Sequence, residues 1–279
     1  MSTAVETVKN PTGKTSTGHR GVAPIQAGQG NSFLWRRLHS LSGIIPIGAF
    51  LVEHFVSNAA ATNGPHAYAE QVKFLTSLPF VTVLEFVGIW LPIAYHAIYG
   101  IYIWIRSAPN LGSYPETSNW LYSLQRWSGI LALAYMIQHV YYLRFAGQHL
   151  MYAPGASFAK VQHELLNPVM LGWYVLGIVS ATWHLGYGIF LFASKWGIIT
   201  GARARTWTFR FSVLVFLAMT GLGFASLYSF IKPEYRNGQN GEYIRQSLTD
   251  TDKAKAIEAG TDPISQENEK LHQSQPPQQ

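Results

Sequence analysis

The stretch PVMLGWYVLGIVSATWHLGYGIFLFASK, Pro168–Lys195, is long and apolar, yet it contains a histidine, His184. A helix of about 20 apolar residues crosses a hydrocarbon core about 30 Å thick. The stretch is therefore predicted to span a membrane, in a chain that is 48% hydrophobic and only 12% charged. A histidine inside such a helix is costly, so it needs a partner or a function.

Four more apolar runs complete a predicted all-α integral membrane bundle of five transmembrane helices. The predicted spans cover residues 33–58, 80–106, 119–145, 168–195 and 207–231. Pro46 and Pro92 lie inside two of them, which membrane helices tolerate where neighbours satisfy the freed carbonyl. We expect three parts: a disordered cytoplasmic tail (1–32), the membrane domain (33–231) and a hydrophilic, disordered outer tail (232–279).

Charge and cysteine content exclude several functions. The net charge of +6 comes from Lys and Arg residues that lie mostly at helix ends and in the tails, without the aromatic-basic face that nucleic acid needs. The chain has no cysteine, so it can carry no c-type haem attachment and no cysteine-ligated iron–sulfur cluster. Any such cluster must belong to a partner.

The basic residues also predict the orientation in the membrane. With the N-terminus in the cytoplasm and the C-terminus outside, the inner side receives Arg36, Arg37, Arg106, Arg126, Lys195, Arg203, Arg205 and Arg210. Only Lys73, Arg144 and Lys160 then fall in the outer loops, as the positive-inside rule expects.

Four histidines sort by depth into two pairs when a rise of about 1.5 Å per residue is counted from the inner-side charges. His54 and His139 lie roughly 20 to 25 Å from the inner surface and form the outer pair. His96 and His184 lie roughly 15 to 17 Å from it and form the inner pair. Each of the first four predicted helices therefore supplies one intramembrane histidine.

A weak internal repeat supports this pairing. The first and third helices share the letters SGI, at Ser42 and Ser128, and the second and fourth share His-x-x-Tyr-Gly, in YHAIYG and WHLGYG. Gly100 and Gly188 each follow a histidine by four residues on the same helical face, where glycine would make room for a flat ring.

Two opposed imidazoles at each of two depths favour two stacked b-type haems with axial histidine ligands. A zinc or copper site is weaker because no carboxylate or thiol completes a tetrahedral shell, although a metal transporter stays an alternative, as does a bundle with structural histidines. The bc type of cytochrome places two histidines on each of two helices, unlike this chain. Candidate partners of the haem propionates near the inner helix ends are Arg36, Arg37, His39, Ser40, Arg126 and Lys195.

The stretches FLWRRLHSLSGIIPIGAFLVEHFVSN, LPIAYHAIYGIYIW, LQRWSGILALAYMIQHVYYLR and ATWHLGYGIFLF closely resemble the cytochrome b subunit of succinate dehydrogenase. The similarity is to the five-helix, two-haem form of menaquinone-using bacteria, within the succinate:quinone oxidoreductase and fumarate reductase superfamily. It implies that His54 and His139 hold the distal haem, and that His96 and His184 hold the proximal one.

The resemblance also implies partners and a place in the respiratory chain and the tricarboxylic acid cycle. A flavoprotein would oxidise succinate, an iron–sulfur protein would pass the electrons on, and this subunit would anchor both at the cytoplasmic face of the plasma membrane. Electrons would then cross two haems to a quinone, expected to be menaquinone, near the outer face. A dihaem anchor of another respiratory dehydrogenase, of the hydrogenase or formate dehydrogenase kind, stays the alternative.

Quinone reduction needs protons, so an ionisable side chain at outer depth is expected at the quinone site. Glu85, about three turns before His96, is the first candidate, and Glu53, Glu70 and His66 are the others. The fumarate reductase branch carries a glutamate two residues before the helix-four ligand, where this chain has Thr182. That departure favours the succinate-oxidising direction.

Overall fold

The computed structural model describes residues 28–106, 116–146 and 156–235, and every regular element in these ranges is helical. The chain divides into a unit of residues 1–36, described only from residue 28, and a unit of residues 37–279 that holds the bundle. The prediction of an all-α membrane bundle is confirmed. The two predicted tails lie outside the described residues, apart from 28–32 and 232–235.

Proline divides the first predicted span. Helix α1 (Gly28–Ile44) ends two residues before Pro46, which begins α2 (Pro46–Asn58), and a short 3₁₀ turn, η1 (Ala59–Asn63), follows. Because proline has no N–H to donate, it is tolerated in the first turn of a helix but interrupts one that is already running. His39 and His54 therefore lie on separate helical segments.

The other predicted spans are also helical. The second comprises α4 (Val81–Glu85), the π-helical turn η2 (Phe86–Trp90) and α5 (Leu91–Arg106). The third is α6 (Thr117–Val140) with the π-helical turn η3 (Tyr141–Phe145). The fourth and fifth are α8 (Pro168–Lys195) and α9 (Ala202–Ile231), the last of which begins five residues before its predicted start at residue 207.

Within the described ranges, four stretches are long and apolar enough to cross a membrane: Ser32–Asn63, Val81–Arg106, Pro168–Lys195 and Ala202–Ile231. Their outward-facing side chains fit lipid, because Ile98 and Ile105 are 69% and 70% exposed although strongly apolar. Helix α6 does not reach the same hydropathy, since polar residues such as Gln125 and Gln138 interrupt it. Its crossing of the membrane stays a prediction.

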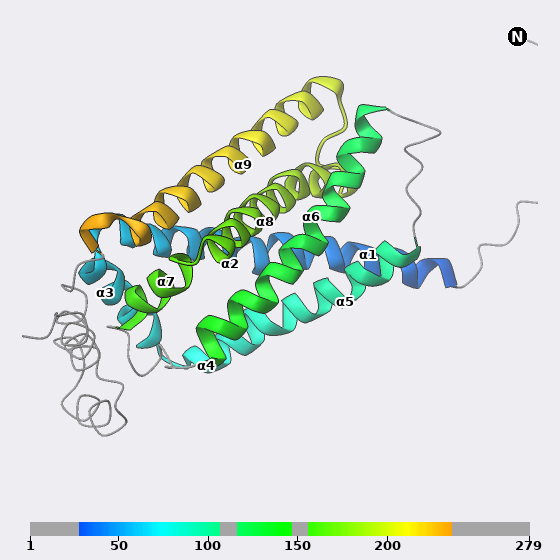
Figure 1. Cartoon of the computed structure of the whole chain (residues 1–279). Coiled ribbons are helices and arrows are strands. Elements are labelled where there is room, and N and C mark those ends of the chain that lie inside the picture. Colours follow the sequence, from blue (N-terminus) through cyan, green and yellow to red (C-terminus); the bar gives the residue numbers. More distant parts are fainter. Residues whose placement is uncertain (1–27, 107–115, 147–155, 236–279) are drawn as a thin grey trace, which may run out of the picture. The chain divides into compact units, whose positions relative to one another are not determined.

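The arrangement within residues 37–279 brings the histidine-bearing helices together. Helix α8 packs against both α6 and α9, while α5 contacts α2 and α6 (Figure 1). We call the end of this bundle that carries α3 and α7 the outer end, following the predicted orientation, and the opposite end the inner end.

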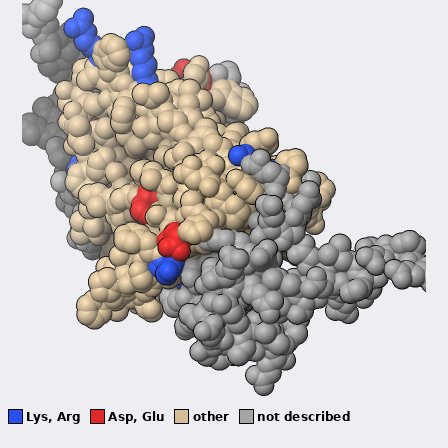
Figure 2. All heavy atoms as spheres, turned by 90° about the vertical axis from the view of Figure 1, so that its left-hand side faces the viewer, with Lys and Arg blue, Asp and Glu red and all other residues tan. Residues whose placement is uncertain are grey.

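Two short helices at the outer end were not predicted from the sequence. They are α3 (Pro65–Thr76) and α7 (Ser157–Leu165), which contact each other. Helix α7 also contacts α8 and α9, and α3 contacts α2 and η1. A buried apolar cluster joins them to the long helices and includes Tyr68, Phe158 and Phe230. Figure 2 looks onto this end, where charged side chains are scattered among the other described residues.

Candidate haem sites

The inner pair consists of two imidazoles facing each other across the bundle. His96 on α5 and His184 on α8 have ring centroids 6.1 Å apart, and their planes are perpendicular, at 89°. The depth count from the sequence placed these two side chains at one level. The structure brings them within reach of a single flat group between them.

The inner ligands are oriented by matching groups from the two halves of the repeat. His96 Nδ1 lies 2.9 Å from the carbonyl of His39 and 3.3 Å from Ser42 Oγ. His184 Nδ1 lies 3.1 Å from the carbonyl of Gln125 and 3.4 Å from the hydroxyl of Ser128. Because a carbonyl can only accept, each Nδ1 must carry the hydrogen. Nε2 is then the nitrogen that can bind a metal.

Glycine makes room for each inner ring, but at positions that sequence reasoning missed. A Cβ added at Gly43 would lie 2.5 Å from His96 Cε1, and one at Gly129 would lie 2.7 Å from His184 Cε1. These glycines follow the two serines just described, so the repeated SGI letters were the available signal.

The two glycines predicted from the sequence, Gly100 and Gly188, pack beside His39 and Gln125. A Cβ at Gly100 would lie 3.2 Å from His39, and one at Gly188 would lie 3.6 Å from Gln125. They therefore pack against the residues whose carbonyls hold the inner ligands, and their role beside a haem stays a prediction.

His39 supports the inner pair directly. Its ring stacks on that of His96 with centroids 4.0 Å apart and an angle of 14° between the planes. Its Nδ1 is buried and has no hydrogen-bond partner among the described residues. The equivalent residue in the other half of the repeat is Gln125, so the two halves differ here.

The outer pair is formed by His54 on α2 and His139 on α6. Their ring centroids lie 5.9 Å apart, and the ring planes meet at 87°. Asn58 lies beside His54, with Nδ2 3.3 Å from its Nε2 and 2.7 Å from its carbonyl. The hydroxyl of Tyr68 donates to Asn58 Oδ1 over 3.2 Å, and burial raises the pKa of Tyr68, which keeps this donor neutral.

His139 is held by side chains instead of by a carbonyl. Its Nδ1 lies 3.3 Å from the hydroxyls of both Tyr135 and Tyr174. Tyr174 in turn donates to Glu164 Oε2 over 2.6 Å, and Gln138 Nε2 donates to the other carboxylate oxygen. Sequence reasoning missed Glu164, because α7 was read as part of an outer loop.

Both pairs fit an iron porphyrin. Two axial imidazoles on opposite faces of one iron place their ring centroids roughly 6 Å apart, which both pairs match. Within the described ranges, no three histidine, aspartate or glutamate side chains converge as a site for a metal ion would need. The chemistry offered is therefore two opposed neutral donors at each of two levels.

The predicted propionate partners gather at the inner end. Arg37 lies 4.9 Å above the ring of Trp196 and donates to the carbonyl of Lys195 over 3.3 Å. Trp196 donates to Ser40 Oγ over 3.0 Å. Arg126 donates to the carbonyl of Trp104 over 2.6 Å and so joins α6 to α5. Arg36 is exposed on α1. Contact of any of these groups with a propionate stays a prediction.

Of the four predicted quinone-site residues, Glu85 has the most specific partner. Its carboxylate forms a 2.7 Å ion pair with Arg144 in η3, and both side chains are about 30% exposed (29% and 31%). Each partner borders or lies in a π-helical turn, a feature frequent at functional sites. Glu53 accepts from Ser57, which also accepts from Gln71 Nε2 over 3.1 Å.

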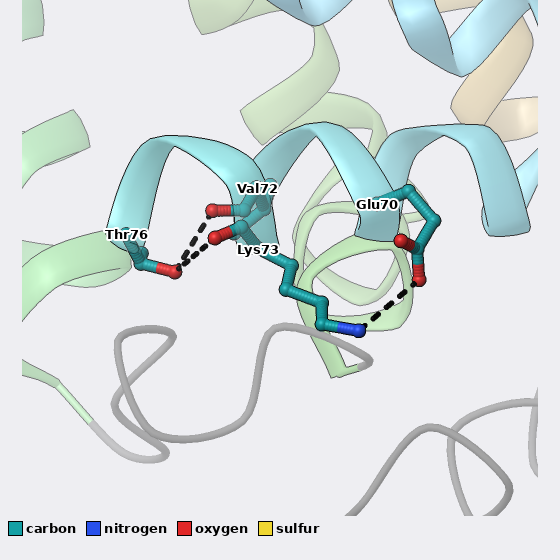
Figure 3. Close-up of polar contacts among 4 residues, drawn as sticks. All are labelled: Glu70, Val72, Lys73 and Thr76. Atoms are coloured by element: carbon teal, nitrogen blue, oxygen red, sulfur yellow. Dashed lines mark hydrogen bonds and ion pairs between the residues drawn. The ribbon is translucent and has the colours of Figure 1, made fainter. Parts of the chain in front are cut away.

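The other two lie on α3. The Glu70 carboxylate is 3.8 Å from Lys73 Nζ, and both side chains are more than half exposed. Figure 3 shows this pair one turn from Thr76, which bonds to carbonyls of its own helix. His66 is also exposed. The structure does not bring these two residues to the outer pair.

Two further features border the sites. Thr182, fully buried, bonds to Thr220 over 2.7 Å and joins α8 to α9. An open, mostly apolar hollow of about 480 Å³ lies beside the outer pair, and its lining residues are Gln138, Val169, Met170, Gly172, Trp173 and Leu176. The amide oxygen of Gln138 is buried and has no hydrogen-bond partner among the described residues.

Comparison with known proteins shows the family of this chain. No protein-family model matches the chain. The succinate dehydrogenase cytochrome b558 subunit of Bacillus subtilis (strain 168) is 37% identical over 199 residues, which cover 71% of this chain and 97% of that protein. With a membrane bundle and two pairs of opposed histidines in place, this chain belongs to the family of succinate dehydrogenase cytochrome b subunits.

Proposed function

We propose that this subunit is a dihaem anchor that passes electrons from an iron–sulfur partner, through an inner and then an outer haem b, to a quinone. The observation that carries the proposal is the presence of two pairs of imidazoles at the separation that one iron requires. When bound, the haems would supply one-electron carriers at two depths of the bilayer. The relative's name, a cytochrome b subunit of succinate dehydrogenase, supports both the cofactor and the reaction.

The chain's own part in this function is to hold four neutral imidazoles, three of which, His96, His184 and His139, have an acceptor at Nδ1. The inner carbonyls fix the hydrogen on Nδ1 of His96 and His184, so Nε2 is available as a donor. The surrounding apolar helices exclude water. Such a setting favours neutral imidazoles over charged ones, as metal ligation requires.

The partner subunits would bind at the inner end. The predicted orientation puts that end in the cytoplasm, at the inner face of the bacterial plasma membrane, where flavoprotein and iron–sulfur subunits of succinate dehydrogenase would dock. Arg37 and Arg126 at this end belong to the basic set that fixes the orientation.

Quinone, expected to be menaquinone, would react at the outer end. The open hollow lined by Gln138 is the proposed entry for a quinone, which must arrive from lipid, and Gln138 directly precedes the proposed ligand His139. Glu85 with Arg144, and Glu53 with Ser57, are the proposed proton-handling groups. Glu70 and His66 are less favoured because both lie on the short helix α3 and not on a predicted span.

The test is to purify the chain with its partners and measure haem content and electron acceptance. We expect a flavoprotein and an iron–sulfur subunit to co-purify, two haems b per chain, and succinate-dependent reduction of both haems and of added menaquinone analogue. Reduction by formate or hydrogen instead of succinate would support the alternative anchor. A folded protein without haem would support structural histidines and contradict the proposal.

A further inference from the structure

Glu164 is a buried carboxylate that the proposed electron path does not yet use. Glu164 is only 5% exposed, and it lies on α7 within the apolar outer end. Burying a carboxylate is costly unless hydrogen bonds satisfy it. Both of its oxygens are satisfied, one by the Tyr174 hydroxyl at 2.6 Å and the other by Gln138 Nε2.

These hydrogen bonds lead to an outer ligand. The Tyr174 hydroxyl has a single hydrogen, which it donates to Glu164, so its oxygen can only accept from His139 Nδ1, 3.3 Å away. In the proposed relay His139 therefore donates to Tyr174, and Tyr174 donates to the carboxylate. The Tyr135 hydroxyl, which also lies 3.3 Å from His139 Nδ1, is then a second acceptor for the same hydrogen. The relay leaves His139 Nε2 as the nitrogen available for iron.

Among the residues that the structure describes, neither His96 nor His184 is connected to a carboxylate in this way. His96 and His184 donate to the backbone carbonyls of His39 and Gln125, which carry no net charge. An imidazole whose N–H is linked by hydrogen bonds to a carboxylate is more electron-rich than an imidazole whose N–H donates to a backbone carbonyl. The difference between the two pairs therefore predicts a difference in how strongly their ligands stabilise oxidised iron.

We propose that Glu164 is a positioning residue for the outer haem, acting through Tyr174 to orient His139 and to lower the reduction potential of that haem. The proposal rests on the proposed dihaem function. Glu164 touches neither substrate nor the ligand ring. Its role is separate from the quinone-site candidates Glu85 and Glu53, which bond to Arg144 and Ser57.

The experiment is a redox titration, followed by haem absorbance, of the purified complex carrying Glu164→Gln. Glutamine keeps the shape and an acceptor for Tyr174 but removes the charge. We expect the outer haem to favour reduction roughly tenfold more, a rise of about 59 mV for a one-electron couple, with the inner haem unchanged. The outer transition is identified as the one missing from a His54→Ala variant.

Tyr174→Phe provides the second variant, and it decides the case if Glu164→Gln does not fold. It keeps the carboxylate but breaks the relay, so it should shift the same transition in the same direction. The double variant should shift it by less than the sum, because both changes break one relay. Glu116→Gln, a carboxylate removed at the inner start of α6, is the matched control and should shift neither transition.

Three results would overturn the proposal in a protein that holds two haems: no shift in Glu164→Gln, equal shifts of both haems, or no shift in Tyr174→Phe. The last would mean that the charge acts through space and not through Tyr174. A wild-type protein with fewer than two haems would instead contradict the proposed function. The two failures are therefore distinguishable.

Discussion

The inner and outer histidine pairs have nearly the same separation between rings, 6.1 and 5.9 Å, but different supports. The inner rings donate to backbone carbonyls and pack on glycines, and both halves of the repeat use the same arrangement. The outer rings are supported by side chains that the repeat does not share. The two halves of the repeat thus share the groups that support the inner pair, whereas the groups that support the outer pair differ between the halves.

This difference has a physical consequence. A backbone carbonyl is present whatever the side chain, so the inner pair depends mainly on the space that Gly43 and Gly129 leave. The outer pair depends on the identity of Asn58, Tyr174 and Glu164, any of which one substitution can change. Inner variants should therefore fail by steric conflict, and outer variants by altered hydrogen bonding.

Loss of a ligand should have the largest effect and should separate the two sites. His96→Ala is expected to remove the inner haem and leave the outer one, while His54→Ala does the reverse, because in the proposed arrangement each pair holds its own iron. Haem content and redox titration of purified complexes would show one remaining transition of different potential in each variant. His163→Ala, an exposed histidine on α7, should keep both haems. Loss of both haems from either variant would contradict the prediction that the two pairs hold their haems independently.

Alanine at Gly43 or Gly129 should have the next largest effect, confined to the inner haem. The new methyl group would stand 2.5 or 2.7 Å from a ligand ring, and overpacking of this kind typically costs about 1–3 kcal/mol. Weakened retention of the inner haem during detergent dialysis would show it. Gly221→Ala, where a Cβ meets no atom within 4 Å, is the matched control. A normal inner haem in both variants would contradict the steric account.

Gly177→Ala should act on the outer pair instead. Its Cβ would collide with the ring of Tyr135, which stacks on His139 with centroids 5.3 Å apart. The nearest ring atom is Cγ, so the whole tyrosine ring must shift. Because Tyr135 is a neighbour of His139 and not itself a proposed ligand, we expect a smaller change in haem retention than at Gly43, seen as a shifted outer transition with both haems retained. A shift in the inner transition alone would contradict the assignment of this glycine to the outer site.

The spans and both histidine pairs could be predicted from the sequence because each follows from distance along a helix. Hydropathy located Pro168–Lys195, and counting residues from the inner-side charges placed His54 level with His139. Helices α3 and α7 were missed because they are short and carry polar side chains, so neither has a membrane signal.

The supports of the ligands were harder to predict because they depend on contacts between helices. Nothing in the local sequence indicates that Gly43 faces His96, which lies on another helix, although the repeated SGI letters marked the position. Glu164 reaches His139 only through Tyr174, and both connections depend on tertiary packing.

Ser42→Ala and Ser128→Ala should have the smallest effect. Each serine adds a second contact to a ligand Nδ1 that already has a carbonyl acceptor, so about 0.5–1.5 kcal/mol is the most that its hydrogen bond should contribute. We expect both haems to be retained, with inner potentials close to wild type. Loss of the inner haem would show that the serine, and not the carbonyl, orients the ring.

The most direct test of the central claim is an experimental density map of the assembled complex. The account predicts one porphyrin between His54 and His139 and a second between His96 and His184, with His96, His184 and His139 coordinated through Nε2. A single porphyrin, or an iron that joins a histidine of one pair to a histidine of the other, would contradict it.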